Sequence, residues 1–216
     1  MKIGIIPAAG RAERFGGTMK DLLPLGGQAL IKRTYDILNK HCDQIVIVTN
    51  EERIEYHAHV IGPGAVYLLQ ENKHADIFGA IHAAVKHIDG EERYYFSMPD
   101  TVIPEDAFDT APHGCDFALG TFQTTRPERF GVIRDRQVVN KNRHLAPPCT
   151  AWGVLVWSKY VAGMWKLQPD QTYTQAINGA MKHFGFMTFE LKYYYDVANE
   201  EDYYYALDKY WEWRSV

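Results

Sequence analysis

IGIIPAAGRAERFGGTMKDLLPLGGQALI, residues 3–31, begins as a short apolar run and continues as a polar loop rich in glycine. The run at residues 3–8 is rich in β-branched side chains and is followed by Gly10, which is typical of a buried strand. A loop over 9–27 comes next, and apolar residues over 29–39 lie near helical spacing. A buried strand, a loop and a helix in this order indicate the first unit of an α/β domain.

The same alternation continues through the first half of the chain. Short apolar runs predict strands at 44–49, 65–70 and 93–100, and segments of helical period predict helices at 51–60 and 76–87. Right-handed crossovers between such strands place helices on both faces of the sheet and collect the loops at one edge. The predicted fold class is therefore α/β, with a three-layer, Rossmann-like, mixed and mostly parallel sheet.

The second half of the chain is less regular. Strands are predicted at 115–122, 130–135, 136–139 and 151–157, joined by short turns. They indicate a small antiparallel β-rich lobe that could hold a second substrate. A last helix is predicted from Asn199 to Trp213, because Asn199 is a good N-cap and three acidic residues follow it.

Composition limits the possible functions. A chain of 216 residues fits one domain, and its 46% hydrophobic and 23% charged residues are an ordinary globular balance. The net charge of -4 argues against a protein that coats nucleic acid. No apolar run is long enough for a signal peptide or a membrane span. Three widely spaced cysteines favour free thiols in a reducing compartment, so a cytoplasmic location is expected.

The loop at 9–27 carries the strongest chemical signal. Small residues let backbone N–H groups approach phosphates, while Arg11, Arg14 and Lys20 would offset the charge of a triphosphate. The loop is neither a P-loop nor a dinucleotide-binding GxGxxG turn. The residues alone leave an ordinary basic surface loop as an equal alternative.

The loop resembles that of the sugar-1-phosphate nucleotidyltransferase family, whose GT-A-like members open with about LAGGxGTRLxPLTxxxPKxLLP. Related small cytidylyltransferases open with PAAGxGxRM. Residues 7–10, Arg14, Lys20 and residues 22–24 match these patterns, and residues 26–31 are similar to the family's xGKPLI. Ala12 stands where the family has a second glycine, and Met19 stands where it has the proline before the lysine.

The resemblance implies a site built from both halves of one domain, residues 1–216. Residues from about 1–110 would bind the nucleotide, through Ala8, Ala9, Gly10, Arg11, Arg14, Lys20 and Gln70. Arg14, Lys20 and Asp100 would be catalytic. Asp100, in SMPD, and Asp196, in YYYD, resemble the family's two aspartates that hold Mg²⁺, an ion that prefers few protein ligands.

Residues from about 111–216 would hold a sugar phosphate. Gly131 and Gly153 resemble glycines in the family's YGV and xTGxY segments, and Lys141 resembles the lysine of its EKP segment, which contacts the sugar phosphate. Asn140 replaces the glutamate of that segment, so the identity of the second substrate stays open.

The activity implied is transfer of a nucleotide from a triphosphate to a sugar 1-phosphate, with release of pyrophosphate. The partners would be a nucleoside triphosphate and a phosphorylated small molecule, without nucleic acid or membrane. An alternative is a cytidylyltransferase that acts on an alcohol phosphate such as phosphocholine or a polyol phosphate. A non-catalytic nucleotide-sugar sensor and a glycosyltransferase are further alternatives, although residues 100–102 lack the DxD motif of the latter.

Two other features could suggest a site. His57 and His59 are two residues apart on a predicted helix and do not face each other, so a metal role is not indicated. The aromatic residues over 193–213 could form a contact between subunits of a homo-oligomer, and internal packing explains them equally well.

Overall fold

A mixed sheet forms the centre of the protein, which we describe from a computed structural model over residues 1–10, 18–70, 77–88 and 92–213. Nine strands of the described chain belong to it. Its parallel part has the order β6-β1-β4-β5, with bounds β1 (Lys2–Pro7), β4 (Gln44–Thr49), β5 (Ala65–Leu69) and β6 (Arg93–Phe96). The side chains of β1 and β4 are buried on both faces, which explains their continuous apolar runs.

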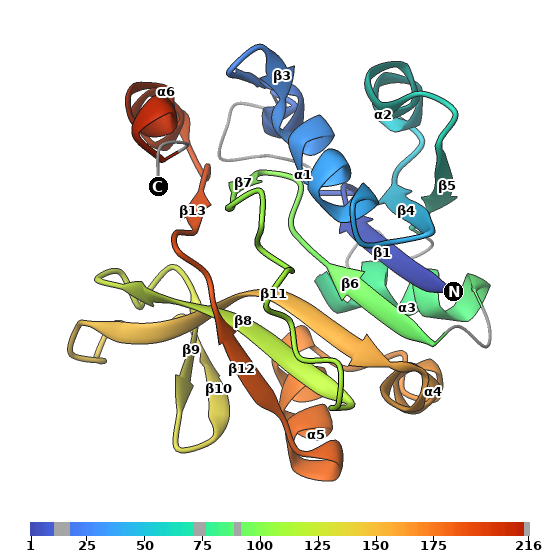
Figure 1. Cartoon of the computed structure of the whole chain (residues 1–216), viewed down its shortest axis with the longest axis vertical. Coiled ribbons are helices and arrows are strands. Elements are labelled where there is room, and N and C mark those ends of the chain that lie inside the picture. Colours follow the sequence, from blue (N-terminus) through green and yellow to red (C-terminus); the bar gives the residue numbers. More distant parts are fainter. Residues whose placement is uncertain (11–17, 71–76, 89–91, 214–216) are drawn as a thin grey trace.

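The second half of the chain extends the same sheet (Figure 1). The long strand β11 pairs antiparallel with β6, and also with β8 and β9. The edge strand β12 runs parallel to β8. The bounds are β8 (Phe117–Thr124), β9 (Gly131–Arg134), β10 (Gln137–Asn140), β11 (Cys149–Ser158) and β12 (Met187–Glu190). The predicted lobe is thus continuous with the parallel strands.

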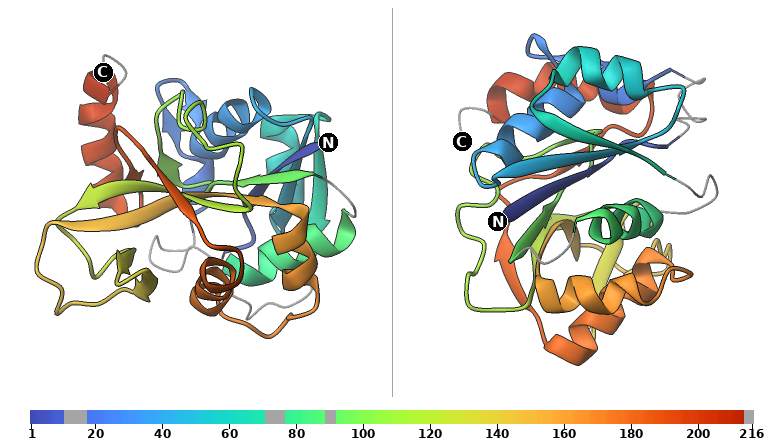
Figure 2. Two further views of the ribbon diagram at one scale, coloured as in Figure 1. Left: turned by 60° about the horizontal axis from the view of Figure 1, so that its bottom comes forward. Right: turned by 90° about the vertical axis from the view of Figure 1, so that its right-hand side faces the viewer.

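Helices cover both faces of the sheet, so the predicted three-layer α/β fold is confirmed (Figure 2). The helices α1 (Leu30–Asn39) and α2 (Ile54–Ile61) lie on one face. The other face carries α3 (Ile77–His87), α4 (Lys159–Lys166) and α5 (Tyr173–Phe184). Each helix layer buries apolar side chains against the sheet in its own core cluster.

The last helix, α6 (Glu200–Trp213), packs on a small hairpin next to α1. The hairpin consists of β2 (Pro24–Leu25) and β3 (Gln28–Ala29), joined by Gly26 and Gly27. Both glycines have positive φ angles, 61° and 85°, as a two-residue hairpin turn requires. A side chain at Gly26 would also collide with the ring of Tyr210, so glycine is needed here for close packing of α6.

Element boundaries differ from the predicted ones at several places. The strand predicted at 93–100 ends at Phe96; the N–H of Ser97 still donates to Ile5 of β1, and residues 99 and 100 form a turn. The helix predicted at 51–60 begins at Ile54, and the strand predicted at 115–122 is shifted to 117–124. The elements α4, α5 and β12 were not predicted. Asn199 caps α6 as predicted, because its side chain accepts a hydrogen bond from the N–H of Asp202 at 2.9 Å.

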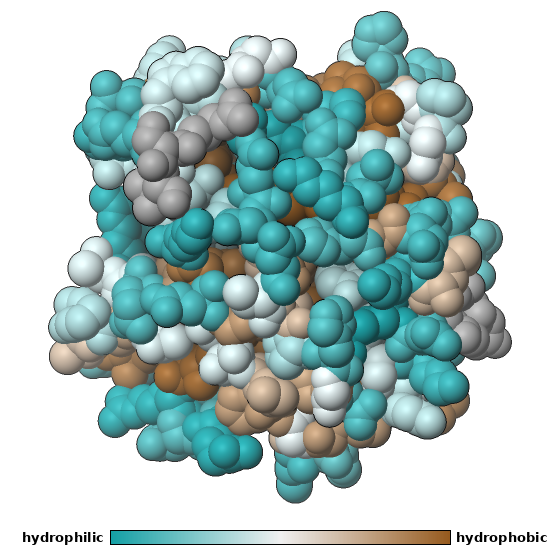
Figure 3. Space-filling view, in the orientation of Figure 1, coloured by the Kyte–Doolittle hydropathy of each residue, from teal (hydrophilic) through white to brown (hydrophobic). Residues whose placement is uncertain are grey.

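The surface that Figure 3 shows is mostly hydrophilic, and its hydrophobic residues are scattered between polar ones. None of the helices in the described ranges combines the length and the hydropathy that crossing a bilayer requires.

Candidate active site

The carboxyl ends of the parallel strands form the edge at which ligands bind in open α/β sheets. Ala8 follows β1 and donates its N–H to Val48, so the sheet uses this amide. The side chain of Asn50, after β4, donates to the carbonyl oxygen of Ala9 at 3.0 Å. Gln70 follows β5 and donates its N–H to Thr49. Gly10 is exposed beside them, and the predicted phosphate-binding residues Arg11 and Arg14 lie outside the described residues.

The structure brings two predicted catalytic residues together. Lys20 belongs to η2 (Lys20–Leu22), a single turn of 3₁₀ helix, and its Nζ forms an ion pair with Oδ2 of Asp100. Asp100 lies in the turn after β6, four residues beyond the end of the strand, and its side chain is 9% exposed. A buried carboxylate is stabilised by such a pairing.

Asp196 lies beside Asp100 through a short antiparallel ladder. The strands β7 (Thr101–Val102) and β13 (Tyr195–Asp196) pair Thr101 with Asp196, and the N–H of Val197 donates to the carbonyl oxygen of Asp100 at 3.0 Å. The two aspartates that the sequence placed 96 positions apart therefore share one site. This ladder was not predicted from the sequence.

The charge balance around Asp100 leaves one of its oxygens available. Burial raises the pKa of Asp100 above its ordinary value, the ammonium of Lys20 opposes this shift, and the carboxylate of Asp196 adds to it. Oδ1 of Asp100 is buried and has no hydrogen-bond partner in the described part of the chain. A buried anionic oxygen next to a second carboxylate fits a divalent cation.

Within the described ranges, no group of three potential ligand side chains is found. Two carboxylates are nevertheless sufficient for Mg²⁺, which completes its octahedron with water and phosphate oxygens. The residues Asp100 and Asp196 therefore fit the ion that the sequence analysis expects.

Arg129 holds the second carboxylate. The loop between β8 and β9 places its guanidinium against Asp202, with both bonds at 2.8 Å, and against Oδ2 of Asp196 at 3.0 Å. The carbonyl oxygen of Asp196 accepts a further bond at 3.1 Å. Such an arrangement resembles the outer contacts that orient ligands in metal sites. Arg129 was not predicted from the sequence, although it directly precedes the Phe130-Gly131-Val132 segment.

Both glycines predicted to bind the second substrate are positions of close packing. A Cβ at Gly131 would lie 2.3 Å from Nε1 of Trp152, and a Cβ at Gly153 would lie 2.4 Å from the ring of Tyr194. Gly153 also coincides with a register shift between β11 and β8. Burial, followed by the charges of Asp196 and Asp100, raises the pKa of Tyr194 well above its ordinary value, so this phenol borders the two carboxylates.

Lys141, predicted to hold the phosphate of the second substrate, has an unusual backbone. Its φ angle is 41°, in the left-handed region that residues with a side chain rarely adopt. The N–H of Lys141 donates to Phe130 at 3.0 Å, which ties it to the loop that carries Arg129. Strained backbone of this kind is concentrated at functional sites. The neighbouring Asn140 accepts a hydrogen bond from the hydroxyl of Tyr173 on α5.

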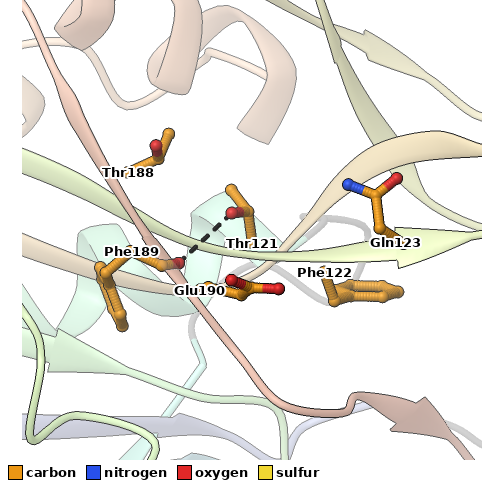
Figure 4. A pocket seen from close by; sticks show the side chains of 6 residues that line it. All are labelled: Thr121, Phe122, Gln123, Thr188, Phe189 and Glu190. Carbon is orange, nitrogen blue, oxygen red and sulfur yellow. Dashed lines mark hydrogen bonds between the residues drawn. The ribbon is translucent and has the colours of Figure 1, made fainter.

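A further pocket, of about 370 Å³, lies along β8 and β12 in the second half of the sheet (Figure 4). It is lined by Thr121, Phe122, Gln123, Thr188, Phe189 and Glu190. The ring of Phe122 stacks on Tyr194 at 4.5 Å between centroids. None of the lining residues was predicted to bind a ligand, and neither Lys20 nor Asp100 is among them.

Comparison with known proteins identifies the family of this chain. Residues 4–157 match the family described as MobA-like NTP transferase domain. The chain is similar to a molybdenum cofactor guanylyltransferase of Photobacterium profundum, with 28% identity over 111 residues. This match covers 51% of the chain and 55% of the relative, so the chain spans about half the length of that protein.

Solved structures of the same fold cover the whole chain. A putative glucose-1-phosphate thymidylyltransferase from Bacillus anthracis superimposes with a TM-score of 0.84 and 20% identity, covering 100% of this chain and 96% of the other. An inositol-1-phosphate CTP transferase from T. maritima gives a TM-score of 0.74 and 17% identity, covering 100% and 95%. At these identities the likeness shows a shared fold.

Proposed function

The chain belongs to the MobA-like NTP transferase domain family, and we propose that it is a nucleotidyltransferase that joins a nucleoside triphosphate to a sugar 1-phosphate. The products are a nucleoside diphosphate sugar and pyrophosphate. One observation carries the proposal: Lys20 pairs with Asp100, whose other oxygen is buried without a partner among the described residues, beside Asp196. This arrangement supplies a cation and an anionic metal site at the edge where the nucleotide would lie.

The reaction is an in-line displacement at the α-phosphorus. An oxygen of the acceptor phosphate forms the new P–O bond, and the bond from the α-phosphorus to the bridging oxygen of pyrophosphate breaks. The acceptor phosphate is dianionic near neutral pH, because its second pKa is about 6, so no general base is needed. Catalysis then consists of positioning and charge stabilisation.

Residues of this chain have separate tasks in that displacement. Lys20 stabilises the charge that develops on the α-phosphoryl group, and Lys141 holds the acceptor phosphate. Arg14, in the undescribed part of the loop, holds the β and γ phosphates. Asp100 and Asp196 would hold Mg²⁺, which neutralises phosphate charge when it is bound.

A second acceptor class is favoured by one observation. Asn140 stands in place of the family's glutamate, and its side-chain oxygen is engaged by the hydroxyl of Tyr173. An amide that is already bonded is a weaker acceptor for sugar hydroxyls than a free carboxylate. An alcohol phosphate therefore remains the second candidate, and the fold shared with the inositol-1-phosphate CTP transferase supports testing it.

A screen of pyrophosphate release tests the proposal. Each of ATP, CTP, GTP, UTP and dTTP is paired with sugar 1-phosphates and alcohol phosphates in the presence of Mg²⁺. GTP with molybdopterin is included because of the guanylyltransferase relative. We expect release with a sugar 1-phosphate that stops with EDTA.

The variant Asp100→Ala is expected to lower this release by on the order of 10²–10³. If pyrophosphate is released only with an alcohol phosphate, the acceptor is an alcohol phosphate and the reaction class stays the same. A folded protein that binds triphosphate by calorimetry but is inactive across the panel would contradict the transferase proposal.

A further inference from the structure

A buried polar cluster lies directly behind the candidate active site, and the displacement described above does not use it. It consists of Asp21, Thr49, Arg53 and His57, all of which are buried. His57, with 0% exposure, lies with Nε2 at 2.7 Å from Oδ2 of Asp21 and with Nδ1 at 2.8 Å from Oγ1 of Thr49. Nη1 of Arg53 lies 3.6 Å from the other oxygen of Asp21.

The hydrogen-bond directions in this cluster are fixed by its acceptor. A carboxylate only accepts, so Nε2 of His57 carries a proton and donates it to Asp21. In the neutral imidazole Nδ1 then accepts from the hydroxyl of Thr49. Thr49 is the last residue of β4, so the cluster links the rigid sheet through α2 to Asp21.

Burying such a cluster in a core is unfavourable in free energy. Removing a carboxylate and a guanidinium from water carries a desolvation penalty, and apolar side chains of similar volume are often at least as stabilising. Stability alone therefore does not account for these residue types. The remaining role for these buried polar groups is to hold the side chains around them in one fixed arrangement.

The geometry that the cluster fixes is that of Lys20. Asp21 is the next residue in η2, a turn of three residues whose N-terminus has no side-chain cap within the described chain. His57 and Arg53 hold Asp21 from inside, while Lys20 projects to Asp100. A shift of Asp21 therefore moves the backbone that carries the Lys20 ammonium.

We propose that His57, acting through Asp21, is a positioning residue that sets where the ammonium of Lys20 stands relative to Asp100. This inference rests on the proposed function for its effect on rate. Lys20 acts mainly on charge that develops in the transition state, so its displacement lowers kcat much more than it weakens binding of the triphosphate. A displacement of about 1 Å in a catalytic group can lower the rate by on the order of 10².

The test uses two substitutions at position 57 in the full chain. His57→Leu removes both hydrogen bonds, whereas the amide of His57→Gln can still donate to Asp21 and accept from Thr49. We expect His57→Leu to lower kcat by on the order of 10² with KM for the triphosphate within about threefold. His57→Gln should recover most of this loss.

Tyr67→Phe is the matched control. It removes the bond from the Tyr67 hydroxyl to the carbonyl oxygen of Gly62, 2.8 Å long, at the far end of α2. It should lower the Tm through the same helix and leave kcat unchanged. Should His57→Leu fail to fold, Asp21→Asn, which weakens the contacts to His57 and Arg53, gives the same comparison.

A second readout needs no turnover. The rate at which Lys20 is acetylated by a small acylating reagent, followed by mass spectrometry, should rise severalfold in His57→Leu and stay at the wild-type value in Tyr67→Phe. Unchanged kcat and unchanged labelling of Lys20 in a folded His57→Leu variant would overturn the inference. Wild-type protein without any turnover would refute the proposed reaction, and the labelling would still decide the positioning of Lys20.

Discussion

The two oxygens of Asp100 have different surroundings. Oδ2 pairs with Lys20, and Oδ1 is buried without a partner within the described residues. Burial and the nearby carboxylate of Asp196 raise the pKa of Asp100 despite Lys20. A buried carboxylate with one unpaired oxygen costs stability, and natural proteins retain such groups mainly at functional sites.

Asp100→Asn should separate stability from function. A carboxyl group whose pKa is raised in the folded state binds its proton more tightly there than in the unfolded chain, so it destabilises the fold above that pKa. We expect the variant to be at least as stable as wild type in urea at pH 7. That advantage should vanish as the pH falls through the raised pKa.

The same variant should lose function. Its Mn²⁺ affinity, measured by electron paramagnetic resonance, should fall strongly, because an amide is a weaker ligand for hard cations. Turnover should fall by on the order of 10²–10³. Wild-type Mn²⁺ affinity in Asp100→Asn would remove Asp100 from the proposed metal site.

Lys141→Gly tests the strained residue at the proposed acceptor site. Glycine adopts the left-handed conformation of position 141 without the cost that a side chain brings, about 1 kcal/mol, so the variant should be as stable as wild type or slightly more stable. KM for the acceptor should rise at least tenfold, while KM for the triphosphate stays the same. Lys141→Asn, whose side chain tolerates this conformation, serves as a control for the loss of charge. An unchanged KM for the acceptor would show that Lys141 does not hold its phosphate.

Among the elements, α6 has an unusual connection to the site. Asp202, in its first turn, is buried, accepts two bonds from Arg129, and receives the N–H of Ala198 at 3.2 Å. Burial alone would raise the pKa of Asp202, but these bonds and the charge of Arg129 outweigh it and hold the pKa below its ordinary value. The same guanidinium contacts Asp196, so the docking of α6 and the position of a candidate metal ligand depend on one side chain.

Asp202→Asn should therefore have a pH-dependent effect on stability. A carboxyl group whose pKa is lowered by folding contributes stability that is fully present above its unfolded pKa, about 3.9, and is lost as the pH falls through the folded pKa. At pH 7 we expect a loss of about 2 kcal/mol in the free energy of unfolding. Urea denaturation at pH 7 and at about pH 3 measures the difference, which should shrink at the lower pH. A loss that is equal at both pH values would mean that the pairing with Arg129 contributes little.

Secondary structure was predictable where local sequence determines it. The strands at 44–49 and 65–70 and the helix at 29–39 have clear periods, and they form within one residue of the predicted ends. The helix α5 was predictable but was missed: Thr172 and Gln175 form a capping box at its start, and its buried residues 176, 177, 180 and 181 lie at helical spacing. The strand β12 was missed because it is an edge strand that pairs with β8 alone.

The candidate site was predictable only in its chain-local parts. Lys20 and Asp100 could be selected because each belongs to a recognisable loop motif, and the structure brings them into contact. Arg129 and His57 could not, since their partners lie 73 and 36 positions away in the sequence. Contacts of this kind depend on the packing of the whole chain, which one sequence does not encode in any local pattern.

At the scale of the molecule, the proposed nucleotide and acceptor regions share one continuous sheet. The strand β11 pairs with β6 of the parallel part and with β8 and β9 of the second half. Aromatic side chains of both parts meet in one core, in which Tyr94 and Trp157 stack at 5.5 Å. Cooperative unfolding in one step is expected from this continuity.

Ligand binding should therefore stabilise the whole protein. A triphosphate with Mg²⁺ at a concentration about 100 times its Kd adds about 2.7 kcal/mol to the free energy of unfolding. For a chain of this size, the Tm should rise by roughly 5–10 °C in one transition, as measured by scanning calorimetry. EDTA should remove most of the increase. Two separate transitions, with only one of them moved by the ligand, would show that the halves unfold independently.

The strand β11 has a consequence for how substrates would be enclosed. A single ten-residue strand that is hydrogen-bonded to both halves resists hinge bending and shear between them. We therefore expect the separation between the nucleotide and acceptor regions to stay constant through the catalytic cycle. Enclosure of the substrates would then come from the loops that border the sheet. The constant separation between the two regions would select acceptors of a matching length.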